Sequence, residues 1–258
     1  MKTAIYLFLT LVFTGTCFFI APAAQAQQTG LKLEIKKKEV FVVGPENAVS
    51  VDTLIMHDKS IIQFDPAKYG KLEAKVAIIG KDCVISSKGA DGRRGMNTNP
   101  GEDGGNGGLL SVMLRFEKLG KLTIDTGGGK GGAGANGRHG QSGTPSKHEY
   151  RKIIDTKGHS QMTIVFIPGE PGTNGSDATM GGSGGHGGML SFMYSTNGFI
   201  PVFNQEGRTS NSIIIHTRAG LKGRTGSPGR GGYGSFDGSV ISSEQRTPRD
   251  GQIQLINL

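Results

Sequence analysis

Glycine-rich loops are the first places where this sequence could hold a ligand. Residues 129–134, GKGGAG, match the G-x-G-x-x-G dinucleotide fingerprint and directly follow the strand-like KLTID. That fingerprint requires a helix to begin within it, but glycine recurs through Gly143, at about 1 kcal/mol for each helix-interior site. GGGKGG (127–132) also lacks the Ser or Thr that follows the lysine of a phosphate loop. The sequence therefore predicts no cofactor.

Metal-binding patterns are incomplete in the same way. GGAGANG (131–137) approaches the calcium-binding repeat of secreted toxins, but Asn136 stands where Asp is expected and the motif does not recur in tandem. The segment GGHGG (184–188) has a counterpart in GGNGG (104–108), in which Asn106 stands where His186 does. A polar side chain is therefore all that this position needs. The histidines have no zinc-ligand spacing: His57, His139, His148, His159, His186 and His216. We predict no metal site.

Catalytic groups are equally hard to assemble from the sequence. No nucleophile stands with a base, and no carboxylate pair shares one recognisable element. We therefore predict no catalytic residues and no enzymatic activity. A β-helix polysaccharide-active enzyme is the alternative, and it would need acids gathered on one solenoid face: Asp58, Asp65, Asp82 and Asp125.

The N-terminus indicates export. Lys2 precedes an apolar run over 4–21, and Ala24-x-Ala26 is a processing pattern, so we expect a signal peptide over 1–26 rather than a membrane anchor. The expected location is the periplasm, the outer membrane's surface, or the cell surface and medium. Only Cys83 remains after cleavage, in an apolar stretch typical of a buried, inert thiol.

Residues 27–88 contain short apolar segments separated by turns such as Gly44-Pro45 and Asp65-Pro66. Alternating and continuous apolar runs at about ten-residue spacing predict β-strands. We expect an all-β fold with few or no helices, in which this segment is a solenoid or a sandwich, two possibilities that the sequence does not separate.

From residue 89 onward glycine recurs at every third position in four runs. The runs form two matching pairs, one offset by about 80 residues and the other by about 92 residues. Each run adjoins a strand-like segment such as LLSVMLRF (109–116). The pattern predicts a duplication, with repeat 1 over 89–168 and repeat 2 over 169–258.

A period of three matches neither an α-helix nor a strand; it is the period of the polyproline II conformation. Glycine at every third position leaves a bare face on which another backbone can pack and accept hydrogen bonds. We therefore predict an intramolecular polyglycine II bundle with these structural glycines: Gly104, Gly107, Gly128, Gly131, Gly184, Gly187, Gly220 and Gly223. Whether the runs pack within one chain or between chains stays open.

These glycine triplets resemble the polyglycine II bundle proteins, such as the snow flea antifreeze protein and phage tail adhesins. The resemblance covers about 89–143 and 169–234, and it implies a backbone conformation rather than a function, because the same backbone serves ice, glycan and protein partners. This chain departs from those proteins by alternating its collagen-like glycine runs with apolar strands.

The basic side chains point to an anionic partner. The formal net charge is +8, and many cations lie on the glycine runs and their loops. Few aromatic residues stand among them to stack on bases, which together with export argues against nucleic acid. The candidate partner-contact rim is Asn136, Arg138, His139, Arg224 and Arg230.

Together these features predict an exported, non-enzymatic structural or interaction module of a bacterial cell envelope, which presents rigid glycine-rich faces to an envelope protein or an anionic glycan. A surface glycan-binding or ice-binding adhesin is an alternative, although Thr98, Thr173 and Thr179 are sparse for an ice-binding row. The sequence leaves the oligomeric state open.

Overall fold

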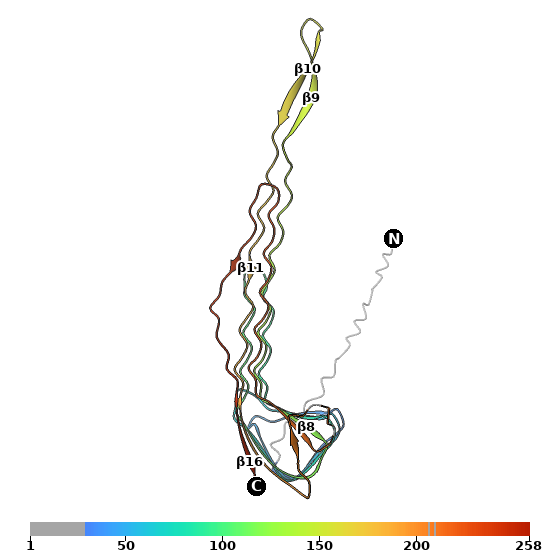
Figure 1. The fold of residues 1–258 in the computed structure, drawn as a ribbon, viewed down its shortest axis with the longest axis vertical. Helices are drawn as coiled ribbons and strands as arrows, with labels where there is room; N and C mark the ends of the chain where they lie inside the picture. The colour runs from blue at the N-terminus through green and yellow to red at the C-terminus, as the bar shows by residue number, and fades with distance from the viewer. Residues whose placement is uncertain (1–28, 206, 209) are drawn as a thin grey trace, which may run out of the picture.

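The computed structural model describes residues 29–258 except 206 and 209, so the predicted signal peptide lies outside the described residues. The described chain contains sixteen strands and no helix. At one end, two parallel sheets form a head, and from the head the glycine-rich segments extend as a long, narrow stalk (Figure 1). None of the residues described forms a helix with the length and hydropathy needed to cross a membrane.

The first sheet contains the longer strands of the head, all parallel. Its order is β1 (Thr29–Ile35), β3 (Ala48–Met56), β5 (Gly70–Ile79), β7 (Leu110–Leu119), β12 (Met189–Thr196) and β16 (Gln252–Asn257). The second sheet contains shorter strands, also parallel. Its order is β13 (Val202–Phe203), β14 (Ser212–His216), β8 (Lys121–Asp125), β6 (Cys83–Ser86), β4 (Ile61–Gln63) and β2 (Val40–Val42).

Alternating apolar side chains build the core between the two sheets. In the first sheet Val49, Leu72, Val112 and Phe192 are paired in register across four strands, and all four are buried. A row in the second sheet runs through Ile62, Ile85 and Ile124, which are also buried. Because neighbouring strands are in register, equivalent apolar residues stack into continuous rows, as the period of two requires.

The predicted solenoid or sandwich over residues 27–88 is wrong. That segment supplies only half of each sheet, and strands from both glycine-rich repeats complete them, β7, β12 and β16 in the first and β8, β13 and β14 in the second. The parallel pairing excludes an antiparallel sandwich. The chain also leaves the sheets three times for the stalk, so successive strands are not regular solenoid coils. Local apolar patterns predict strands but do not specify which distant strands pair.

Six glycine-rich segments form the stalk, numbered 1 to 6 in chain order: 87–97, 99–109, 126–144, 168–188, 217–232 and 233–251. Their backbones are joined by hydrogen bonds at every third residue. The N–H groups of Gly89, Gly92 and Gly95 in segment 1, for example, donate to carbonyls of segment 3 with N···O distances of 3.0, 2.7 and 2.8 Å. Segments 4 and 6 also pair briefly as β11 (Ala178–Thr179) and β15 (Val240–Ile241).

Segments 3 and 4 lie at the centre of the stalk. Segment 3 exchanges backbone hydrogen bonds with segments 1, 2, 4 and 5, and segment 4 does so with segments 2, 3, 5 and 6. The stalk also narrows away from the head. Segments 1 and 2 turn back near residue 97 and segments 5 and 6 near residue 234, whereas segments 3 and 4 continue to the hairpin of β9 (Lys147–Ile154) and β10 (Ser160–Ile167) at the far end (Figure 1).

Candidate functional site

The predicted structural glycines lie where stalk segments approach most closely. A β-carbon added at Gly104, for example, would overlap the carbonyl oxygen of Gly129, and one at Gly220 would overlap the same oxygen. The other six predicted positions would each overlap a backbone carbonyl oxygen of a neighbouring segment in the same way. None of the eight has a positive φ, so close backbone approach, and not an unusual dihedral angle, requires glycine there.

Short polar side chains satisfy backbone N–H groups that have no carbonyl partner in the stalk. The Oδ1 atom of Asn106 accepts from the N–H of His186 at 2.9 Å, and the Nδ1 atom of His186 accepts from the N–H of Arg249 at 3.0 Å. Asp103 likewise accepts from the N–H of Ser183 at 2.7 Å. The Arg246 guanidinium beside Asp103, helped by that N–H, lowers the pKa of this carboxyl. Equivalent positions of the repeats therefore link segment 2 to segment 4 and segment 4 to segment 6.

The predicted rim residues divide into two kinds. Asn136 and His139 are used within the stalk, because their Oδ1 and Nδ1 atoms accept the N–H groups of Ser227 at 3.1 Å and Arg230 at 2.9 Å. Arg138, Arg224 and Arg230 are exposed. The arginines thus carry exposed charges, whereas Asn136 and His139 each use one polar atom within the stalk.

Two grooves on the stalk bring some rim residues together. Arg138 and Asn136 line a groove of about 870 Å³ with Arg94, at the step where segments 1 and 2 end. His139 and Arg230 line a second groove of about 590 Å³. Arg224 lines neither, so the structure does not join the five residues into one site.

The candidate functional residues identified from the sequence do not include the terminal hairpin of β9 and β10. β9 and β10 pair antiparallel over their whole length. Asp155 shapes the turn between them, because its Oδ1 atom accepts the N–H groups of Lys157 at 2.9 Å and His159 at 2.8 Å, and Gly158 has φ 83°. The signal was present in the alternating QMTIVFI (161–167), which follows the turn residues of DTKG.

One face of the hairpin is apolar and exposed. The register places Tyr150 opposite Ile164 and His148 opposite Phe166. The ring centroids of His148 and Phe166 are 5.3 Å apart. Met162 and Ile154 extend this face towards the turn, and all of its large apolar side chains are more than half exposed. An isolated two-stranded hairpin is marginally stable in water. A surface of this kind at the end of a stalk is typical of a binding site.

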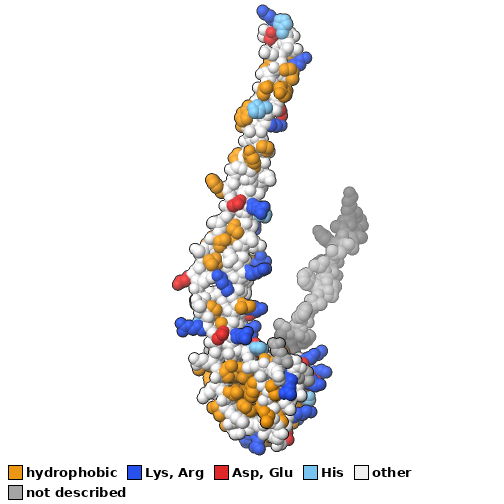
Figure 2. All heavy atoms as spheres, viewed as in Figure 1, with side chains coloured by type: hydrophobic (Ala, Val, Ile, Leu, Met, Phe, Trp, Pro, Cys, Tyr) orange, Lys and Arg blue, Asp and Glu red, His pale blue; other side chains and the backbone are white. Residues whose placement is uncertain are grey.

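Cations lie on both faces of the hairpin: Lys147 and Arg151 project from the face opposite the apolar one. Lys147 and Arg151 both pair with the carboxylate of Glu149. These contacts, mainly the hydrogen bond from Lys147, lower the pKa of Glu149. Lys152 lies on the apolar face, in register with Met162, and Lys157 lies in the turn. Basic side chains are also visible along the stalk and at its far end (Figure 2).

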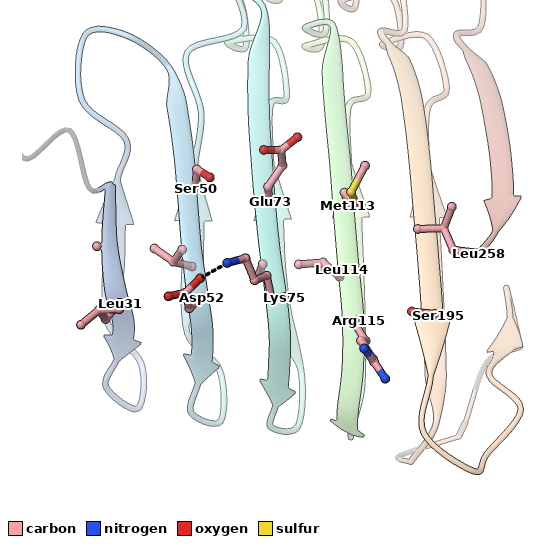
Figure 3. A pocket seen from close by; sticks show the side chains of 13 residues that line it. Leu31, Ser50, Asp52, Glu73, Lys75, Met113, Leu114, Arg115, Ser195 and Leu258 are labelled. Carbon is pink, nitrogen blue, oxygen red and sulfur yellow. Dashed lines mark ion pairs between the residues drawn. The ribbon is translucent and has the colours of Figure 1, made fainter.

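A second candidate surface is a trough of about 810 Å³ on the outer face of the first sheet (Figure 3). Asp52 and Lys75 form an ion pair across it at 2.6 Å, and this hydrogen bond raises the pKa of Lys75. Arg115 and Ser195 continue the polar row on β7 and β12. The charged side chains of this row are either paired or exposed. They do not converge on one point, as the groups of a reacting centre would.

The acids required by the enzyme alternative do not come together. Asp58 and Asp82 lie in turns at one end of the second-sheet strands, and Asp65 and Asp125 at the other. Each serves its own surroundings: Asp58 accepts from the N–H of Lys81, and Asp82 pairs with Lys121 at 3.2 Å. Within the described residues, no three His, Cys, Asp or Glu side chains are grouped as metal ligands.

The predicted buried thiol and two of the threonines considered for an ice-binding row also have defined environments. The Cys83 thiol is buried in the core, and burial raises its pKa. Thr173 and Thr179 accept the N–H groups of Gln141 and Ala135, both at 2.7 Å. These two threonines therefore bind the stalk internally and do not form part of an outer row.

No protein-family model, curated protein or solved structure matches this chain. Its function is therefore inferred from its own residues and their geometry.

Proposed function

We propose that this protein is an exported, non-enzymatic interaction module of a bacterial cell envelope. Its stalk holds the hairpin of β9 and β10, with the arginines of the rim, away from the head and towards an acidic partner, for which we favour an anionic glycan over an envelope protein. The single observation that carries the proposal is the exposed apolar face of this hairpin, with Lys152 on it and Lys157 in its turn, at the far end of a hydrogen-bonded stalk.

The backbone of the stalk supports a role as a rigid spacer. Glycine recurs every third residue, N–H groups at the same interval donate to neighbouring segments, and a β-carbon at these glycines would overlap a carbonyl oxygen. This pattern is consistent with the polyglycine II conformation that we propose for the stalk. A spacer held by cross-segment bonds keeps a distant surface at a fixed distance from the head.

The charge of the hairpin supports an acidic partner. Lys152 and Lys157 lie apart from the Glu149 cluster, and neither forms an ion pair with a described residue. Cations that are not held in an ion pair attract anionic polymers over about 8 Å at physiological ionic strength. Tyr150 and Phe166 add apolar area for close contact.

Binding to an immobilised acidic polysaccharide, with heparin as the probe, tests the proposal. In the Lys152→Glu/Lys157→Glu variant we expect affinity to fall at least tenfold and its salt dependence to weaken, because two cations at the contact become anions. The matched control is Lys36→Glu/Lys37→Glu, which changes the charge equally in the turn after β1, at the opposite end of the molecule.

The two variants separate a local site from general charge attraction. Equal losses in both variants would mean that the polysaccharide responds only to net charge, and the proposed tip site would be wrong. Turnover of the polysaccharide by the unmodified protein would contradict the non-enzymatic assignment.

A further inference from the structure

The strand β16 leaves the core of the head unfinished. The buried row of Val49, Leu72, Val112 and Phe192 continues in register to Leu255 on β16, and the row of Leu110 and Leu190 continues to Ile253. Leu255 and Ile253 therefore face the same inner side as buried residues, yet they are 45% and 46% exposed. The inner face of the last strand is apolar but uncovered.

The inner face of β16 is uncovered because the second sheet is short at this end. The strand at its matching end, β13, contains only Val202 and Phe203. A groove of about 560 Å³ remains between β14 and β16, lined in part by Ile214, Ile215 and Ile253. The open groove runs along the same side of the head as the free edge of β16.

The edge of β16 also lacks the features that keep sheet edges apart. Residues 252–258, QIQLINL, contain no charge, no proline and no glycine, and every residue of β16 is exposed. The opposite edge, β1, carries Lys32 and Glu34, and Lys36, Lys37 and Lys38 follow it. Charged side chains, lysine above all, discourage edge-to-edge pairing, so of the two edges of the first sheet β16 is the one open to another strand.

We propose that β16 pairs antiparallel with β16 of a second copy of this chain, joining the two first sheets about a two-fold axis. With Gln254 opposite its own counterpart, Ile253 of each copy faces Leu255 of the other on the inner side. The uncharged edge suits self-pairing in an otherwise basic protein, in which other surfaces repel a second copy. The charged β1 edge does not fit β16 in this way.

The size of the contact sets its strength. In this register residues 252–256 pair, which gives an edge about 17 Å long and buries less than the ~800 Å² per partner of a standard interface. The groove residues of both copies enlarge it, and we expect a monomer–dimer equilibrium in the micromolar range. Because β7, β12 and β16 begin where stalk segments 2, 4 and 6 end, antiparallel pairing directs the two stalks, with their hairpins, in opposite directions.

Sedimentation equilibrium of the exported chain tests the association, independently of any partner of the hairpin. We expect Leu255→Lys to weaken dimerisation at least 100-fold, because it places like charges on the paired edge, while the melting temperature stays unchanged. The matched control, Leu31→Lys on the opposite edge strand, is also at an exposed leucine and should leave the dimer intact.

Mild oxidation of cysteine variants tests the register. Gln254→Cys should form an intermolecular disulfide, whereas Gln252→Cys should not, since only residue 254 faces its own counterpart; Cys83 is buried and does not compete. A protein that stays monomeric at 100 times the ~1 µM scale of the equilibrium would overturn the proposal. Dimers lost in Leu31→Lys and kept in Leu255→Lys would overturn it as well.

Discussion

Single polar atoms decide how the stalk is held together where glycine packing leaves an N–H group without a carbonyl. Asn106, His186, Asn136 and His139 each accept such a group through one side-chain atom. Asn and His appear at equivalent positions because either side chain can place an acceptor there. His139 and His186 are therefore cross-links of the stalk.

Substituting His186 tests this role. We expect His186→Asn to keep the acceptor and leave stability within about 0.5 kcal/mol, as at the equivalent Asn106. His186→Leu should cost about 1 kcal/mol, since the N–H of Arg249 loses its partner and recovers only some of the energy from water. Urea denaturation and amide exchange at Arg249 measure both effects; equal exchange in the two variants would contradict the cross-link.

The stalk segments pack directly against one another through their backbones. Equivalent positions of the two repeats lie side by side, as the hydrogen bonds between residues separated by 80 positions show at Asp103, Asn106 and Glu117. The same separation pairs β7 with β12, where Leu110 lies opposite Leu190. The repeats thus pack against each other within one structure, and glycine is needed wherever two segments touch.

A glycine-to-alanine pair tests the packing. Gly220→Ala should destabilise the protein by about 1–3 kcal/mol, because the new β-carbon overlaps the carbonyl oxygen of Gly129 in the centre of the stalk. Gly30→Ala is the control: nothing lies within 4 Å of its β-carbon, so stability should stay the same or rise by up to about 1 kcal/mol. Thermal denaturation of both variants gives the comparison, and similar melting temperatures would refute close packing at Gly220.

The whole molecule is a head with a tapering stalk. Segments 1 and 2 end first, segments 5 and 6 next, and segments 3 and 4 alone continue to the hairpin (Figure 1). Each step exposes apolar side chains at a turn, Met96 at the first and Tyr233 and Phe236 at the second. The most distant surface is therefore carried by the fewest segments, which are also the two at the centre of the bundle.

Small-angle X-ray scattering tests this shape. A compact domain of this size has a radius of gyration of about 17 Å. Segment 3 alone spans about 55 Å at ~3.1 Å per residue, and the hairpin adds about 35 Å, so we expect a radius of gyration near 30 Å for the monomer. A value close to that of a compact domain would mean that the stalk collapses onto the head.

How much the sequence predicts depends on whether the feature is local. The eight structural glycines could be identified from spacing, because every close contact between segments removes space for a side chain at the same interval. The strands of residues 27–88 could also be recognised, because side-chain alternation is a local property. Asn136 and His139 could be located, but their acceptor roles depend on Ser227 and Arg230, which are 91 residues away.

Glycine-lined segments alternating with apolar strands can be recognised from the chain alone, since period and side-chain size are properties of neighbouring residues. Three features become visible only in the folded molecule: strands from the whole chain form two shared parallel sheets, the stalk narrows towards the hairpin of β9 and β10, and β16 is left with an open edge. They depend on the fold because strands and glycine-rich segments take their hydrogen-bond partners from distant parts of the chain. The local pattern specifies the capacity to pair, and the fold selects the partner.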